Sequence, residues 1–218
     1  MSTASPDTIQ IGDYDLSDWA NDPLAFAECF WPHVTFYRQQ REIILSVRDN
    51  DETYVVAGNG LGKDFVSGFI VLHFFLTRSP CRIITTSATD RHLNVLWGEM
   101  GRFIQTCRFD LDATHGGPLI INQRKLRKMV DGKECKMSYV EGIVAGPDTM
   151  EAMGGHHDPI GDPRCPRSLF IGDEASALHD DYYKKASPWF KRALFIGNAW
   201  PCNNFFRKHV KDGNVLAS

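Results

Sequence analysis

The succession of apolar and polar positions divides the chain into strands and helices that follow one another in turn. Short segments that are almost continuously apolar and rich in β-branched or aromatic residues predict buried strands. They are 52–58, 81–88, 168–175 and 192–200. The segments predicted as helices lie between or after them and are 36–51, 63–77, 89–107, 176–186 and 203–210. Strands that alternate with helices predict an α/β fold, with a mostly parallel sheet and helices on both faces.

The rest of the chain has weaker patterns. Residues 1–21 are polar and acidic without a clear period, so we expect a loose lead-in. An Asp-Pro helix start and a closing proline predict a helix over 22–32. The glycine- and proline-rich stretch 109–167 predicts short strands at 117–122 and 135–146, followed by a long loop.

Length and composition narrow the class of protein. The 218 residues, 43% hydrophobic and 23% charged, suit one large globular domain or a domain with an appendage. We expect a lead-in and helix over 1–34 and the main domain over 35–212. The longest apolar stretch, 65–76, is shorter than the roughly 20 residues of a membrane span, and the N-terminus does not resemble a signal peptide. The six cysteines lack CxxC spacing, which disfavours a zinc site and suits reduced thiols in the cytosol.

Charge is distributed unevenly along the chain. The net charge of −3 excludes a protein coated in basic residues. Residues 123–136 nevertheless carry six basic and two acidic side chains, and 182–211 carry seven basic side chains and no acidic one. Such segments can form surfaces that hold a polyanion, or they can be ordinary solvated surfaces. Charge alone leaves both interpretations open.

The segment VVAGNGLGKDF (55–65) joins a predicted strand to a predicted helix. Its glycines allow backbone N–H groups to approach a phosphate chain, and Lys63 supplies an amine for the outer phosphates. Phosphate-binding loops usually continue with a hydroxyl that binds Mg²⁺, but here the next residue is Asp64. A carboxylate is also a hard oxygen ligand, so we expect Asp64 to bind the metal and to make nucleotide affinity depend steeply on magnesium. The alternative is a glycine-rich turn without a ligand.

An acidic pair, Asp173-Glu174, follows the apolar run that begins at Ser168. Because the carboxyl ends of parallel strands meet at one edge of a sheet, we expect this pair to face the glycine loop. Asp173 is predicted to hold Mg²⁺, and Glu174 to orient and deprotonate the attacking water; a simple helix cap is the alternative. Asn198 ends the next predicted strand, where it either senses the γ-phosphate or is a turn residue.

Taken together, these motifs resemble the ATPase domain of the large terminase subunit of tailed bacteriophages. The resemblance covers about residues 35–206. The segments that carry it, in chain order, are FYRQQREII, VVAGNGLGKDF, RIITTSATDRHLNVLWGEM, MGGHHDP with SLFIGDEASAL, and ALFIGNAWPCNNFF. It implies a P-loop NTPase fold of the RecA-like (ASCE) type. It also implies Mg²⁺-dependent ATP hydrolysis that drives double-stranded viral DNA into the procapsid.

The resemblance also implies roles for single residues. Gln39 or Gln40 would contact adenine, and Glu174 and Lys63 would be catalytic. The residues implied to lie around the nucleotide and its metal are Gly58, Asn59, Gly60, Leu61, Gly62, Lys63, Asp64, Asp173 and Asn198, with Asn198 coupling hydrolysis to movement. The implied partners are double-stranded DNA, a portal protein, a small terminase subunit and further copies of the chain in a ring. The implied location is the cytoplasm of the host cell, without a membrane.

The sequence departs from the family pattern in three respects. Asp64 replaces serine or threonine. The loop 57–64 lacks the arginine that many members carry, so we expect Arg38, Arg41 or a neighbouring subunit to supply that charge. Members carry a C-terminal nuclease domain, and the chain ends before one, so we expect no nuclease activity. Two alternatives stay open: another nucleic-acid translocase or helicase core, and a nucleotide-binding switch that does not hydrolyse.

Overall fold

The central feature of the fold is one large sheet, seen here in a computed structural model. The structure describes residues 9–58, 60–130, 132–159, 166–199 and 201–212, and the backbone of 216–217. The eight strands run in the order β10-β3-β9-β8-β4-β7-β6-β5. They are β3 Glu52–Val56, β4 Arg82–Ser87, β5 Leu119–Asn122, β6 Lys125–Val130, β7 Lys133–Val144, β8 Ser168–Asp173, β9 Arg192–Gly197 and β10 Leu216–Ala217.

The strands from β10 to β7 are parallel, and only β5 and β6 run antiparallel to their neighbours. The prediction of a mostly parallel sheet is therefore confirmed. β9 lies between β3 and β8, so the strand that ends just before Asn198 separates the strand of the glycine loop from the strand of the acidic pair. In the register of β4 and β8, Ser87 lies opposite Asp173, which brings these strand ends together.

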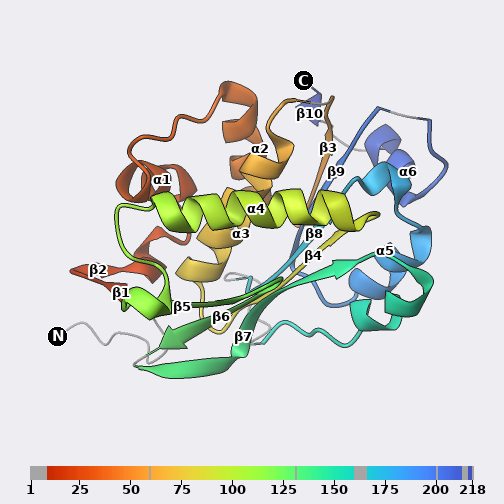
Figure 1. The fold of residues 1–218 in the computed structure, drawn as a ribbon. Coiled ribbons are helices and arrows are strands. Elements are labelled where there is room, and N and C mark those ends of the chain that lie inside the picture. The colour runs from red at the N-terminus through yellow and green to blue at the C-terminus, as the bar shows by residue number, and fades with distance from the viewer. Residues whose placement is uncertain are drawn as a thin grey trace.

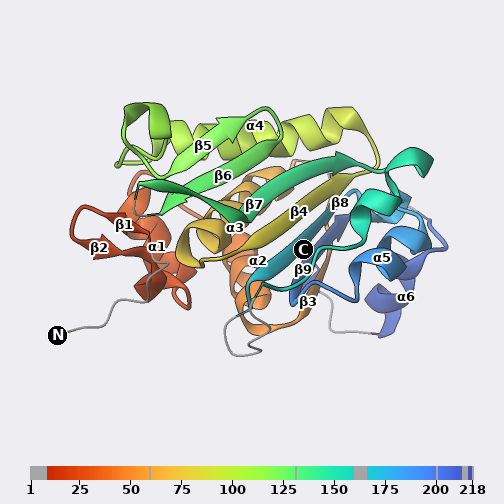
Figure 2. The same cartoon turned by 90° about the horizontal axis from the view of Figure 1, so that it is seen from below.

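Helices cover both faces of the sheet (Figures 1 and 2). They are α1 Pro23–Phe30, α2 Arg38–Asp49, α3 Lys63–Thr77, α4 Asp90–Thr106, α5 Asp180–Ala186 and α6 Phe205–Asp212. Alternate residues of β8 show the division: Leu169 and Ile171 pack in the core with α1 to α4, whereas Phe170 packs in the core with α5 and α6. The expectation of helices on both faces is confirmed.

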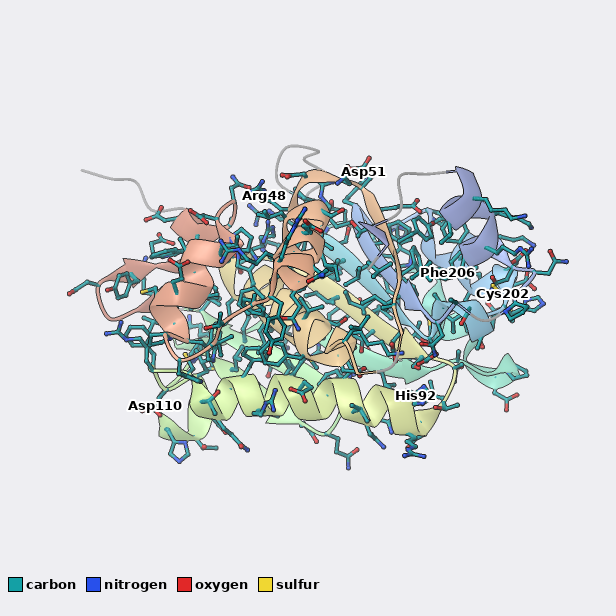
Figure 3. The ribbon with its side chains drawn as sticks, turned by 90° about the horizontal axis from the view of Figure 1, so that it is seen from above. Arg48, Asp51, His92, Asp110, Cys202 and Phe206 are labelled. Carbon is teal, nitrogen blue, oxygen red and sulfur yellow. The ribbon has the colours of Figure 1, made fainter. Side chains whose placement is uncertain are left out.

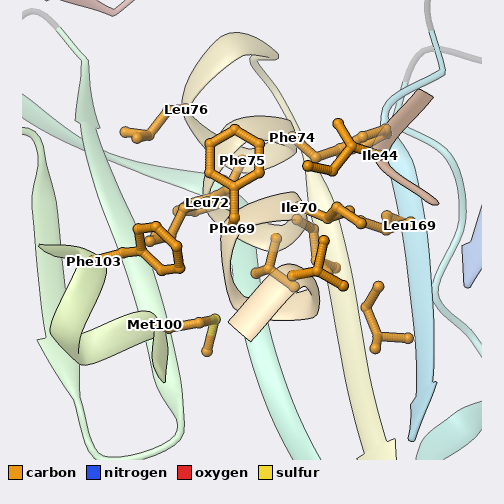
Figure 4. Packing of buried hydrophobic residues seen from close by; sticks show 14 of the residues in the cluster. Ile44, Phe69, Ile70, Leu72, Phe74, Phe75, Leu76, Met100, Phe103 and Leu169 are labelled. Atoms are coloured by element: carbon orange, nitrogen blue, oxygen red, sulfur yellow. The ribbon is translucent and has the colours of Figure 1, made fainter. Parts of the chain in front are cut away.

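The helix after the glycine loop, α3, is buried over nearly its whole length, from Val66 to Thr77. α4 runs beside it, beginning near His92 and ending before Asp110 (Figure 3). Phe69, Leu72 and Phe75 of α3 lie beside Met100 and Phe103 of α4 (Figure 4). Apolar residues all round a helix predict this kind of enclosure, because every face must be covered. Because packing holds α3 in place, its first residue, Lys63, is held at the edge of the sheet.

The N-terminal segment is more ordered than its sequence indicates. The prediction of a loose lead-in is wrong for residues 9–21, which form a small hairpin and a 3-10 turn. The strands are β1 Gln10–Ile11 and β2 Tyr14–Asp15, and the turn is η1 Leu16–Trp19. Leu16 is fully buried in the same hydrophobic cluster as α3. Its isolated apolar side chain gave no periodic signal, which explains why the pattern was missed.

The strand β6 was also missed, because half of its residues are charged. Its Lys128 is completely buried under the end of α3. The Lys128 ammonium donates to the carbonyl oxygen of Phe75 at 2.7 Å and also to that of Arg78. These carbonyls belong to the end of α3, where no further helical N–H groups are available. A lysine in a strand therefore caps a helix, a tertiary contact that local sequence patterns do not reveal.

Candidate functional site

The glycine loop connects β3 to α3 at the carboxyl edge of the sheet. Gly60 and Gly62 have φ values of +83° and +69°, in the left-handed region that favours glycine. At Gly62 there is a second reason for glycine, since a Cβ atom there would lie 2.7 Å from the Gln40 side-chain nitrogen. Gly58 and Leu61 are exposed beside this turn. Asn59 lies outside the described residues.

The start of α2 lies against the glycine loop. The Gln40 side chain is buried; its oxygen accepts from the Tyr37 N–H at 3.1 Å, and its nitrogen donates to the Leu61 carbonyl at 3.5 Å. Gln40 therefore joins the helix start to the loop, whereas Gln39 is exposed. Both line a mostly apolar cavity of about 250 Å³ whose other lining residues are Tyr37, Glu42, Ile43, Val55, Ala57, Gly60, Leu61, Gly62 and Lys63. Contact of either glutamine with adenine stays a prediction.

Two carboxylates, those of Asp64 and Asp173, lie at this edge of the sheet. Asp173 ends β8, is 3% exposed, and accepts a hydrogen bond from the Ser87 hydroxyl at 3.2 Å. Burial, reinforced by the nearby Asp64 carboxylate, raises the pKa of Asp173 to about 6, although the Lys63 ammonium opposes the shift. Asp64 lies in the first turn of α3, and burial raises its pKa as well. The two groups that the sequence assigned to the metal are thus close enough to repel each other.

Glu174 is held by side chains from three other elements. Its Oε1 accepts from the Lys63 ammonium at 2.5 Å, and the two side chains are only 11% and 12% exposed. Its Oε2 accepts from the Asn198 side-chain nitrogen at 3.0 Å. His92 Nδ1 of α4 lies 3.5 Å from Oε1. The Glu174 backbone has φ +50°, which is unusual outside glycine and often accompanies a functional constraint.

A second cavity of about 370 Å³ lies between the glycine loop and the acidic pair. Its lining residues are Gly60, Gly62, Lys63, Asp64, His92, Val95, Asp173 and Glu174. Ligand atoms of His92, Asp173 and Glu174 lie within 4.8 Å of one another, a spacing that could hold a metal ion. The structure therefore brings Lys63, Asp64, Asp173, Glu174 and Asn198 to one place, as the order of the strands predicts.

Sequence reasoning missed two contributors to this site, His92 and Ser87. His92 was seen only as part of a predicted amphipathic helix, but it lies in the first turn of α4 and faces Glu174. Ser87 was seen only as the end of an apolar strand. One sequence signal could have identified both residues. A polar residue at the end of a parallel strand, or in the segment just after it, lies at the edge of the sheet where ligands bind.

The basic segments carry less free charge than the sequence indicates. In 123–136, Lys128 is buried, and the ion pairs are Arg124 with Asp90, Lys125 with Glu141 and Arg127 with Glu134. In 182–211, the ion pairs are Lys184 with Asp181, Lys185 with Glu151, Arg192 with Asp51 and Lys208 with Asp180. The acidic partners come mostly from outside these segments, so counting charges within a segment overestimated its basic character.

The described residues contain no helix that combines the length and the apolar character of a membrane span.

No protein-family model matches the sequence, and no curated protein matches it either. Solved structures do match over most of the chain. The ATPase domain of the Thermus phage P74-26 large terminase, in a variant form, matches with a TM-score of 0.62 and 13% identity. That match covers 85% of this chain and 72% of that domain.

Longer structures match over a similar share of this chain. The large terminase of bacteriophage HK97 matches with a TM-score of 0.63 and 15% identity, over 88% of this chain and 40% of that protein. The large terminase of a thermophilic bacteriophage, in complex with ADP, matches with a TM-score of 0.56 and 13% identity, over 84% of this chain and 45% of that protein. The chain thus spans less than half of these two proteins. The chain therefore has a fold similar to that of the ATPase domain of a phage large terminase, and it matches part of two longer phage large terminases.

Proposed function

We propose that this chain is the ATPase domain of a viral DNA-packaging motor, which hydrolyses ATP with Mg²⁺ and moves double-stranded DNA into a procapsid. The observation that carries the proposal is the contact between Lys63 and Glu174. These residues lie 111 positions apart in sequence and meet at 2.5 Å over a cavity beside the glycine loop. An amine on a glycine loop, opposite a glutamate at the end of the next strand but one in the sheet, suits nucleotide hydrolysis.

Lys63 has two tasks in this proposal. With its ammonium on Glu174, it neutralises a carboxylate that is mostly buried. When a triphosphate enters the cavity, its oxygens offer the ammonium more negative charge than one carboxylate does, so Lys63 transfers to the phosphates. Glu174 then loses its cationic partner and becomes available to accept a proton. Binding of the nucleotide and release of the base are thereby linked through one ion pair.

Asn198 keeps Glu174 oriented after Lys63 has left. Its side-chain nitrogen donates to Oε2, which leaves Oε1 as the oxygen that accepts a proton from water. The Asn198 side-chain oxygen is buried and has no hydrogen-bond partner among the described residues. A buried acceptor without a partner is costly, so a water molecule or a ligand donor at this point would be stabilised. The unpaired Asn198 oxygen supports a position for the attacking water between Asn198 and Glu174.

The residues present fit a magnesium ion. Asp64 and Asp173 offer carboxylate oxygens, which Mg²⁺ prefers, and the mutual repulsion that raises the Asp173 pKa would be relieved by a divalent cation. When bound, the ion would neutralise charge that develops on the outer phosphates. Asp64 carries its own negative charge toward the phosphates, so we expect ATP affinity to depend on magnesium more steeply than with a hydroxyl at this position.

Phosphate release with Mg²⁺ and ATP tests the proposal directly. We expect turnover by the wild type and a loss of roughly 100-fold or more in kcat for Glu174→Gln, because the general base is removed while the shape is kept. The matched control is Glu28→Gln, an exposed glutamate on α1. Absence of turnover in the wild type, with nucleotide still bound, would favour a switch that binds nucleotide without hydrolysing it.

The DNA substrate is the second half of the proposal. Within segments 123–136 and 182–211, the exposed basic side chains without an ion pair among the described residues are Lys133 and Lys136 on the β6–β7 hairpin, Lys191 just before β9, and Arg207 and Lys211 on α6. Arg207 and Lys211 are four positions apart on one helix, so they share a face and can contact neighbouring phosphates. Duplex-stimulated ATP hydrolysis without strand separation would distinguish a packaging motor from a helicase. A portal protein, a small subunit and a ring of copies complete the proposed motor.

A further inference from the structure

A buried asparagine supports the turn that carries Glu174. Asn204 is 9% exposed and lies just before α6. Its side-chain nitrogen donates to the carbonyl oxygens of Leu178 at 2.7 Å and Ala175 at 2.9 Å, and lies 3.3 Å from that of Ser176. One side-chain amide thus contacts three backbone carbonyl groups of a single turn.

These carbonyls belong to the 3-10 turn η5, Ala175–Ala177, and to the residue that ends it. Glu174 is the N-cap of this turn and has the unusual φ of +50°. The backbone bonds within the turn are few: Ala177 N–H donates to Glu174 O at 2.8 Å, and Leu178 N–H donates to Ala175 O at 3.3 Å. A strained residue keeps its conformation only if its surroundings enforce it. Asn204 supplies that enforcement from outside the turn.

The other side of Asn204 is fixed to α6. Its side-chain oxygen accepts from the Arg207 N–H at 3.4 Å, and Asp180 accepts from the Phe205 N–H at 2.6 Å. Phe205 and Phe206 are buried in the core on the same face of the sheet as the turn. Asn204 is therefore a bridge between a well-packed helix and the turn, not a mobile surface residue.

A tight contact closes the turn on its remaining side. A Cβ atom at Gly197, the last residue of β9, would lie 2.9 Å from the Ser176 backbone nitrogen. Asn198, the next residue, donates to the Glu174 carboxylate. The segment that follows β9 thus begins with a residue that holds the Glu174 side chain and reaches, at Asn204, a residue that holds the Glu174 turn.

We propose that Asn204 is a positioning residue, which holds η5 so that the Glu174 carboxylate lies opposite Lys63 and Asn198. The inference rests on the proposed function, because it assigns Glu174 the role of the base. Asn204 touches neither the cavity residues nor the phosphate loop in the described contacts, and it acts through the backbone from Ala175 to Leu178. Its loss should therefore change the rate of hydrolysis and leave nucleotide binding intact.

The test compares Asn204→Asp with Asn203→Asp. Both variants add one carboxylate at adjacent positions, but residue 203 is exposed. In Asn204→Asp an oxygen replaces the donor nitrogen and faces three carbonyl oxygens, which repel it. We expect kcat for phosphate release to fall by roughly 100-fold, as a displacement of about 1 Å at a reacting group can cause. The affinity for Mg²⁺-ADP should stay within about twofold of the wild type, and Asn203→Asp should match the wild type in both assays.

Hydrogen exchange provides a measurement that does not depend on turnover. In Asn204→Asp, but not in Asn203→Asp, the amides of Ala177 and Leu178 should exchange at least about tenfold faster, because the turn that protects them is released. Equal exchange in the two variants, or an unchanged kcat in Asn204→Asp, would overturn the inference. So would a parallel loss of Mg²⁺-ADP affinity, which indicates general damage to the fold.

Two further outcomes can be distinguished from failure of the inference about Asn204. If the wild type binds nucleotide without releasing phosphate, the proposed function fails, while the exchange comparison still decides whether Asn204 holds the turn. If Asn204→Asp does not fold, Asn204→Ala removes the donor without adding a charge and should show the same pattern to a smaller extent. Failure of both variants to fold would make Asn204 a residue of general stability and would overturn the inference.

Discussion

Replacing the buried carboxylate of Asp173 is predicted to make the protein more stable and to remove its activity. Its pKa rises from 3.8 to about 6 in the folded protein, because of burial and the neighbouring Asp64. A shift of about two pKa units corresponds to about 3 kcal/mol, at 1.36 kcal/mol per unit. The ionised form of Asp173 therefore destabilises the protein when no cation is bound. We predict that Asp173→Asn increases the free energy of unfolding by about 3 kcal/mol at pH 8 and abolishes ATP hydrolysis.

The contribution of Asp173 to the free energy of unfolding changes with pH, because the folded and unfolded states bind its proton with different affinity. A group whose folded pKa is raised binds a proton more tightly in the folded state, so its contribution is fully favourable below pH 3.8. That contribution is lost as the pH rises through about 6 and is absent at pH 8. Asparagine is always neutral and can still accept from the Ser87 hydroxyl. The gain from Asp173→Asn should therefore be largest at pH 8 and fall to about half at pH 5, as the linkage relation gives.

Urea unfolding at pH 8 and pH 5, without nucleotide and without divalent metal, measures this gain. The matched control is Asp148→Asn, an exposed aspartate that should change the free energy of unfolding little. Mg²⁺ with ADP should then stabilise the wild type and leave Asp173→Asn almost unaffected, because the variant lacks a metal ligand. A gain of equal size at both pH values, or no gain at pH 8, would refute the electrostatic reasoning.

Other features lead to further predictions. Asp64→Ser should raise ATP affinity in the absence of magnesium by about 1–2 kcal/mol, since one negative charge near the phosphates is removed; titration with and without Mg²⁺ measures it, and equal magnesium dependence in the two proteins would contradict it. The pKa of Lys128 is lowered from 10.5 to about 8 by burial, so the unfolded state binds more protons between these values and wild-type stability should rise across that range. Lys128→Met should lose this rise in urea unfolding, whereas the exposed Lys133→Met should keep it. Arg207→Glu with Lys211→Glu should weaken duplex binding and reduce the salt slope by about two, with Lys133→Glu and Lys136→Glu as the comparison pair; unchanged affinity would remove α6 from the DNA surface.

Much of the fold follows from local sequence patterns. The strands β3, β4, β8 and β9 and the helices that follow them show clear apolar periods, and the structure confirms each of them. The start of α4 also follows a local rule, because threonine is a favoured N-cap residue and the Thr89 hydroxyl accepts from the His92 N–H. Strand ends that carry a lysine, an acidic pair and an asparagine were enough to predict that these residues meet. Parallel topology supplied the remaining constraint, because it collects the carboxyl ends of strands at one edge.

What the sequence did not reveal depends on contacts between distant segments. Charged residues in β6 hide a strand, and only the packed structure shows that Lys128 caps α3. Asn204 reads as part of an ordinary polar turn before a helix, and its three carbonyl partners lie 26 to 29 positions earlier. Ion pairs across the chain neutralise basic segments that looked free. In each case the partner is set by tertiary packing, which no local period encodes.

The anchoring of α3 at both ends has a consequence for how the proposed motor would respond to its fuel. At its start, the Gln40 side chain donates to the Leu61 carbonyl beside Gly62, and at its end the Lys128 ammonium donates to the carbonyl oxygens of Phe75 and Arg78. Because α3 is held at both ends, we do not expect it to shift along its axis when a phosphate is gained or lost. We therefore expect the backbone of the loop with Lys63 to keep its position through each cycle, so that the response to a gained or lost phosphate begins with the side chains of the Lys63–Glu174 ion pair.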